Sequence, residues 1–355
     1  MKETKLDFEQ IEKERQSKFE LLRIISMLFI IIGHYILHSG ICDLSFDSTF
    51  NKYVEFFLKP LANIGVNCFV LISGYFLINS KFKTKSLIKL IFETFFYSIV
   101  IMAIYYFTGT RQINIKETFI TTFSGLYGTY WFITTYLILY LFFPFVNKML
   151  DVDKKKHIFI IILFIILFCA IPTFTLAVNF ENQLFYFITL YSIGAYIRKY
   201  GVPKLMKHKT ITILLSIAIY ILACIISLIT KNMSANFLWC NRDSIFIVLS
   251  SILFFMFFYN IKIKNNKIIN TIAGTTFAIY LIHEHPFNRD FIWKNFFHTD
   301  LFYNEWYFII MVICTSIVIF IVCSLIDFIR KKITSYIKIK KLDEIYIKID
   351  NIFNL

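Results

Sequence analysis

The residues best suited to chemistry lie in one apolar stretch, residues 21–40. Arg23 stands near one end of this stretch and His34 lies deep inside it, where ionisable side chains are costly in a bilayer. Ten residues lie between them. On an α-helix they would therefore share one face, with a rise of roughly 16 Å between them. His38 extends that face by one turn, so one face presents a cation near the membrane surface and an imidazole near mid-depth.

Two interpretations of this face stay open from the residues alone. Histidine titrates near neutral pH and commonly serves as a general base, and arginine binds phosphate oxygens. In the functional interpretation, Arg23 is a fixed cation that can bind a phosphorylated ligand, and His34 is a titratable group held inside the membrane. In the structural alternative, Arg23 reaches back to the lipid headgroups and a neighbouring helix satisfies His34.

More candidate cofactor-binding residues lie near the predicted cytoplasmic surface, where Arg23 also emerges. Ser73 and Gly74 end the second apolar run, and Lys81, Lys83 and Lys85 follow in the next loop. Together with Arg23, the lysines would suit a phosphorylated ligand. The alternatives are close helix packing for the small pair and ordinary topology signalling for the lysines.

A third group of polar and aromatic residues lies toward the predicted outer surface and is expected to bind the substrate. It comprises His38, Asn63, Asn67, Trp131, His283 and Glu284. The two asparagines are one helical turn apart, and the histidine and glutamate end an apolar run. All four tryptophans fall at or beyond outer helix ends, which fits a sugar-binding vestibule and equally an aromatic belt.

The composition of the chain indicates what kind of structural elements position these residues. The chain has 355 residues, is 58% hydrophobic and 17% charged, and has a mean hydropathy of +0.66. These values exclude an ordinary soluble domain and predict an all-α, polytopic integral membrane protein, because a helix satisfies its own backbone in lipid. We predict ten transmembrane helices, at 21–39, 60–79, 90–108, 129–147, 157–177, 183–200, 209–229, 243–260, 268–287 and 306–329.

The net charge of +14 does not indicate nucleic acid, because the basic residues sort by loop. With the N-terminus in the cytoplasm, 28 of the 37 Lys and Arg residues fall in inner segments and 8 in outer loops. This positive-inside pattern places both termini in the cytoplasm. The predicted organisation is an N-terminal tail at 1–20, a ten-helix domain at 21–329 and a basic tail at 330–355.

The seven cysteines show no paired spacing of the metal-binding or redox kind, and we expect no metal. Most of them lie in apolar runs, as small core residues do. Cys42 and Cys240 both fall in predicted outer loops, so a disulfide between them stays open.

Several motifs in this order resemble the acyltransferase-3 family of integral membrane acyltransferases. They are Arg23 with His34, the Phe-Val-Leu-Ile-Ser-Gly-Tyr-Phe-Leu end of the second run, Tyr-Trp-Phe at 130–132 and Tyr-Leu-Ile-His at 280–283. The resemblance spans about residues 18–330. It implies acyl transfer from cytoplasmic acetyl-coenzyme A to a hydroxyl of a cell-surface or lipid-linked glycan, by a stand-alone enzyme of the plasma membrane. The resemblance implies that Arg23 and His34, at the family's essential positions, are catalytic and that Arg23 also binds the cofactor. Lysines stand where many relatives carry arginines.

The chemistry expected from the resemblance agrees with the residues. A sugar hydroxyl is a weak nucleophile and needs a base, for which His34 is placed, and His34 could instead carry the acyl group. Partners are then the glycan and the lipid bilayer, without nucleic acid. The main rival is a flippase or transporter of lipid-linked glycans, against which the missing internal repeat argues. A glycan polymerase would need a larger outer loop.

Overall fold

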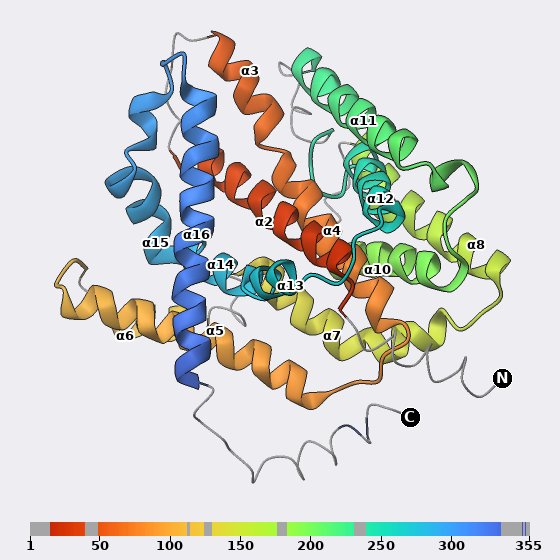
Figure 1. The fold of residues 1–355 in the computed structure, drawn as a ribbon, viewed down its shortest axis with the longest axis horizontal. Coiled ribbons are helices and arrows are strands. Elements are labelled where there is room, and N and C mark those ends of the chain that lie inside the picture. The colour runs from red at the N-terminus through yellow and green to blue at the C-terminus, as the bar shows by residue number, and fades with distance from the viewer. Residues whose placement is uncertain are drawn as a thin grey trace.

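The computed structural model describes residues 15–39, 49–111, 114–123, 130–175, 183–230, 239–334, 350 and 352, and within these ranges the chain forms helices and no strand (Figure 1). The α-helices are α2 (Ser17–His38), α3 (Thr49–Leu58), α4 (Leu61–Leu77), α5 (Thr84–Phe107), α6 (Ile115–Thr122), α7 (Trp131–Met149), α8 (Lys154–Ile165), α9 (Ile171–Phe174), α10 (Gln183–Tyr200), α11 (Lys209–Ile229), α12 (Ile245–Asn260), α13 (Lys267–Ala273), α14 (Thr276–His283), α15 (Pro286–Asp290) and α16 (Phe308–Thr334). A π-helical turn, η2 (Ile166–Ala170), joins α8 to α9, and η4 (Phe291–Phe296) follows α15. The short 3-10 turns are η3 (Leu205–Lys207) and η5 (Thr299–Phe302).

Seven helical segments of the described residues are long and apolar enough to cross a membrane. They are Ser17–His38, Phe50–Leu77, Thr84–Phe107, Trp131–Met149, Lys154–Phe174, Lys209–Ile229 and Phe308–Thr334. Helix α12 is apolar but has only 16 residues, and α10 does not meet the same criterion. The fold class is therefore all-α with several membrane-crossing helices, and ten spans with cytoplasmic termini remain a prediction.

Exposed apolar side chains support contact with lipid. Phe159 on α8, Leu214 on α11 and Leu325 on α16 are 66%, 60% and 55% exposed. Further large apolar residues are exposed along the same helices. Surfaces of this kind are rare on soluble monomers, because water penalises contiguous apolar area.

The predicted span at 268–287 is broken into short helices. Helix α13 ends at Ala273, α14 begins at Thr276, and Pro286 starts α15. Helix α16 stabilises this break, because the ammonium of its Lys331 donates a hydrogen bond to the Gly274 carbonyl at 2.7 Å. The sequence correctly predicts helical structure in this apolar run, but the prediction of one continuous helix is wrong.

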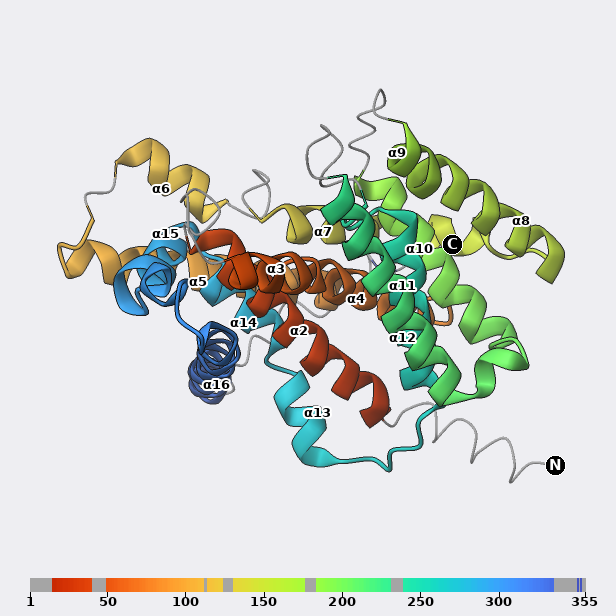
Figure 2. The ribbon, with the colours of Figure 1, turned by 90° about the horizontal axis from the view of Figure 1, so that it is seen from above.

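Helix α4 occupies the middle of the bundle, in contact with α2, α10 and α12. Figure 2 shows α2, α3 and α4 between a group formed by α8 and α10–α12 and a group that includes α5 and α14–α16. Glycine permits the close approach at two crossings. A Cβ at Gly65 would overlap the Ser26 carbonyl of α2, and one at Gly74 would overlap the Tyr191 carbonyl of α10.

Three predicted boundaries change. The first helix begins at Ser17, inside the predicted 1–20 tail, and α16 continues to Thr334, inside the predicted 330–355 tail. Helix α3 occupies residues placed in the first outer loop, because its own apolar side chains pack against neighbouring helices. Cys240 is a buried free thiol, and Cys42, with which the sequence left a disulfide open, lies outside the described residues.

A buried ion cluster joins α5 to α16. The Arg330 guanidinium lies 2.7 Å from the Glu93 carboxylate and 2.6 Å from that of Asp327. The Tyr97 hydroxyl donates to Asp327 at 2.9 Å. A buried charge is tolerated only when it is paired in this way, so the cluster fixes the two helices on one side of the bundle.

Candidate active site

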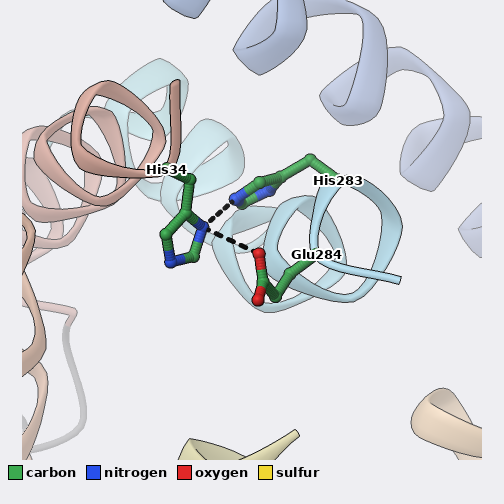
Figure 3. Close-up of side chains that lie close together, drawn as sticks. All are labelled: His34, His283 and Glu284. Carbon is green, nitrogen blue, oxygen red and sulfur yellow. Dashed lines mark hydrogen bonds and ion pairs between the residues drawn. The ribbon is translucent and has the colours of Figure 1, made fainter. Parts of the chain in front are cut away.

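His34 of α2 meets two residues from the end of α14, as Figure 3 shows. Its Nδ1 lies 3.0 Å from Nε2 of His283 and 3.1 Å from Oε2 of Glu284. His283 is fully buried and the Glu284 side chain is 7% exposed. The three side chains come from segments about 250 positions apart, and the break before α14 directs its C-terminal end toward α2.

The hydrogen-bond pattern assigns the proton on His34. Nδ1 of His283 faces the carbonyl of Ile279 at 2.6 Å and must donate to it, so Nε2 of His283 is an acceptor. The Glu284 carboxylate is also an acceptor. Nδ1 of His34 therefore carries the hydrogen and donates toward both. Nε2 of neutral His34 is left with its lone pair, and it points away from both partners (Figure 3).

Glu284 is held by two further donors. Nε2 of His38 lies 3.0 Å from Oε2, and the Arg289 guanidinium lies 2.6 Å from Oε1. Arg289 also donates through Nε to the Glu284 backbone carbonyl at 3.1 Å. This fixed carboxylate beside a histidine resembles the arrangement in which an acidic group orients a base and stabilises its protonated form. No role for Arg289 was predicted from the sequence, although its position five residues after Glu284 was a usable signal.

Arg23 and His34 line one cavity of about 260 Å³. The Arg23 side chain is 31% exposed and pairs with Glu20 at 2.8 Å, which leaves part of the guanidinium accessible. Ser73 lines the cavity too, with its hydroxyl 3.2 Å from that of Tyr136. Most of the remaining wall is apolar or aromatic. It includes Met27, Ile30, Val66, Phe69, Leu90, Trp131, Phe132, Phe277 and Tyr280.

A comparison with protein families decides the class of protein. The family model described as an acyltransferase domain, Acyl_transf_3, matches residues 16–327. This chain belongs to the acyltransferase-3 family. The match covers the whole cavity and the contacts of His34. Comparisons with curated proteins and with solved structures gave no significant match. The chain is therefore an acyltransferase, and its apolar helices make it a multi-pass membrane protein.

The structure of the acyltransferase separates the two asparagines from the cavity. Asn63 donates to the Cys240 carbonyl at 2.8 Å. Asn67 donates to the Arg242 carbonyl at 3.0 Å and to the Ser251 hydroxyl at 3.1 Å. These amides tie α4 to α12 and the segment before it. They share a helix face as predicted, and in this structure that face packs against α12 and the segment before it.

The predicted cofactor-binding lysines do not line the Arg23–His34 cavity of the acyltransferase. Lys81 lines a different cavity, of about 460 Å³, together with Lys148 and Lys199. Lys83 and Lys85 are exposed at the start of α5. Gly74 packs directly against the backbone of α10. Of the predicted cofactor-binding residues, the structure thus brings Arg23 and Ser73 together and leaves the others elsewhere.

The tryptophans do not form one vestibule. Trp131 lines the cavity, and the guanidinium of Arg242 lies 3.9 Å from the centre of its ring. Trp293 is fully buried and Trp306 is 80% exposed. His38, His283 and Glu284, which are predicted to bind the substrate, form a network of contacts around His34.

Proposed function

We propose that this acyltransferase moves an acetyl group from cytoplasmic acetyl-coenzyme A to a hydroxyl of a glycan outside the cytoplasm, in the plasma membrane. The observation that carries the proposal is the shared cavity. A cation suited to phosphate and a histidine with a free ring nitrogen line the same space. The family membership supports acyl transfer, and the geometry supports the division of labour between the two residues.

Arg23 would bind the donor. Its guanidinium is partly exposed and lies near the predicted inner surface, where it can pair with phosphate oxygens of coenzyme A. The separation along α2 is roughly 16 Å, about half the thickness of the hydrocarbon core. An extended pantetheine arm is of this order, so the thioester would reach His34 while the nucleotide stays at the membrane surface.

His34 would act as the base. Its Nε2 takes the proton of the acceptor hydroxyl while the hydroxyl oxygen attacks the thioester carbonyl. The C–S bond then breaks, and the proton passes from His34 to the departing thiolate. Glu284 offsets the charge of the imidazolium between these steps. In the two-step alternative, the same Nε2 attacks the thioester first and forms an acyl-imidazole.

The experiment uses sealed membrane vesicles of known orientation. Radiolabelled acetyl-coenzyme A is supplied on one face, and acetyl transfer to glycan on the opposite face is measured. We expect transfer only when the donor is on the cytoplasmic face. His34→Ala should lower the rate by about 10² to 10⁴, the usual contribution of a positioned base. Arg23→Ala should raise the donor KM more than the acceptor KM.

Two controls make the result decisive. His208→Ala removes an exposed histidine outside the cavity and should leave the rate unchanged. Each variant is compared with the wild type for membrane insertion and thermal unfolding. Transfer supported only by donor on the outer face, or wild-type rates in well-folded His34→Ala, would contradict the proposal.

A further inference from the structure

We propose that His34, His283 and Glu284 form a binding site for a divalent transition-metal ion, with Zn²⁺ as the best-fitting ion, and that its occupation blocks acyl transfer. One ligand atom from each residue lies within 4.8 Å of the others. Among the residues that the structure describes, this is the one such group of three histidine, cysteine or acidic residues. The binding itself rests on geometry, and the blocking effect rests on the proposed role of His34.

The ligand set and its spacing suit zinc. Two imidazole nitrogens and one carboxylate oxygen are a ligand combination found in zinc sites that keep a fourth position open. Zinc binds such atoms at about 2.0–2.2 Å in tetrahedral geometry, so neighbouring ligands stand roughly 3.3 Å apart. Nδ1 of His34 is 3.0 Å from Nε2 of His283 and 3.1 Å from Oε2 of Glu284. Small side-chain rotations would therefore open the site for an ion.

The surrounding contacts orient these ligands. His283 donates from Nδ1 to the Ile279 carbonyl, which presents the lone pair of Nε2 to the site, a common support for zinc-bound histidine. Arg289 holds Oε1 of Glu284, so Oε2 stays on the side of the histidines. Nε2 of His38 lies 3.0 Å from that Oε2, and in the tautomer that carries its hydrogen on Nδ1 it would supply a fourth ligand. His34 also lines the 260 Å³ cavity, which gives the ion a path from solvent.

Binding would change the proton on His34 and thereby its function. A bond from zinc to Nδ1 of His34 needs the lone pair of that nitrogen, so its hydrogen moves to Nε2. No proton is lost from the ring overall. Nε2 then carries a hydrogen and no longer accepts the proton of a hydroxyl. The same ion would also withdraw Glu284 from its hydrogen bond with His34.

The test is direct binding to the purified full-length protein in detergent. After removal of metals with a chelator, Zn²⁺ is titrated in competition with a fluorescent zinc indicator. We expect one tight site per chain in the wild type. Co²⁺ in the same site should give the visible absorption bands of a tetrahedral complex. Glu284→Gln and His283→Ala should each weaken zinc binding at least about tenfold.

Matched controls separate this site from adventitious binding. His208→Ala and His298→Ala remove exposed histidines and should bind zinc as the wild type does. At one zinc concentration, zinc should raise the midpoint of thermal unfolding in the wild type and both controls more than in Glu284→Gln. A cooperative unfolding transition without zinc shows that each variant is folded. Unchanged binding in folded Glu284→Gln, or no zinc site in the wild type, would overturn the inference.

The outcome is distinguishable from that of the proposed function. If zinc does not bind but His34→Ala abolishes transfer, the metal site fails and the acyl-transfer assignment stands. If zinc binds with the expected dependence on Glu284 and transfer does not need His34, the metal site stands and the assignment of the base fails. Zinc bound at this site without any loss of transfer would overturn the blocking effect.

Discussion

Substituting Glu284 by glutamine tests the role of the carboxylate with little change of shape. The carboxylate accepts from His34 at 3.1 Å, from His38 at 3.0 Å and from Arg289 at 2.6 Å. An amide keeps the volume but removes the charge. Its NH₂ group can also donate to Nδ1 of His34, which would favour the tautomer whose Nε2 carries the hydrogen. That tautomer is not a base at Nε2, the nitrogen that the proposed mechanism uses.

The magnitude follows from the lost interaction. A hydrogen bond to a charged group contributes about 1.5–3 kcal/mol. Because about 1.4 kcal/mol corresponds to a factor of ten in rate, loss of one such bond in the transition state lowers kcat about 10- to 160-fold. Complete reversal of the tautomer extends the loss toward about 10⁴, as in the serine hydrolase triad. We therefore expect Glu284→Gln to lose at least about tenfold in kcat.

The assay measures initial rates of acetyl transfer in oriented vesicles over a range of donor concentrations. The donor KM should stay near the wild-type value, because Arg23 is untouched at the other end of the cavity. Glu305→Gln makes the same chemical change at an exposed position and serves as the control. A kcat within twofold of the wild type, in a Glu284→Gln protein that unfolds at the normal temperature, would refute the reasoning.

Three further predictions concern packing and topology. Gly74→Leu places a side chain against the backbone of α10, so it should cost about 1–3 kcal/mol or more and lower the unfolding midpoint; an unchanged midpoint would exclude the close contact. Arg330→Met leaves the buried Glu93 carboxylate without its ion-pair partner and Asp327 with Lys331 alone, and it should cost about 3–5 kcal/mol, whereas Lys264→Met, at an exposed position, should leave the unfolding midpoint near normal. Cysteines at Lys83 and Asn114, in a cysteine-depleted chain, should react with an impermeant thiol reagent from opposite sides of the membrane; same-side labelling would contradict the predicted topology.

The sequence predicted what depends on local periodicity. Helical spacing put Arg23 and His34 on one face, and the structure places both on one cavity. The same rule put Asn63 and Asn67 on one face of α4. The partners of these two side chains could not be predicted from spacing, because they follow 119 or more positions later in the chain.

Long-range contacts explain the other differences. His283 and Glu284 were recognised as unusual polar residues, but their contact with His34 joins segments about 250 positions apart. The break at Gly274 was missed because a hydropathy window records apolar content and not continuity. A residue of α16, Lys331, holds the carbonyl at that break. No local pattern near Gly274 indicates such a partner.

The glycine crossings of α4 restrict how this cavity can adapt to acyl groups of different length. Neither Gly65 nor Gly74 leaves room for a Cβ. A larger residue at either position therefore cannot be used to adjust the spacing between α4 and α2 or α10. Space for a longer acyl chain would have to come from the opposite wall, where Phe132 and Phe277 line the cavity. We expect variation in acyl-chain selectivity among such enzymes to arise on α7 and α14, while α2, which carries both Arg23 and His34, stays fixed.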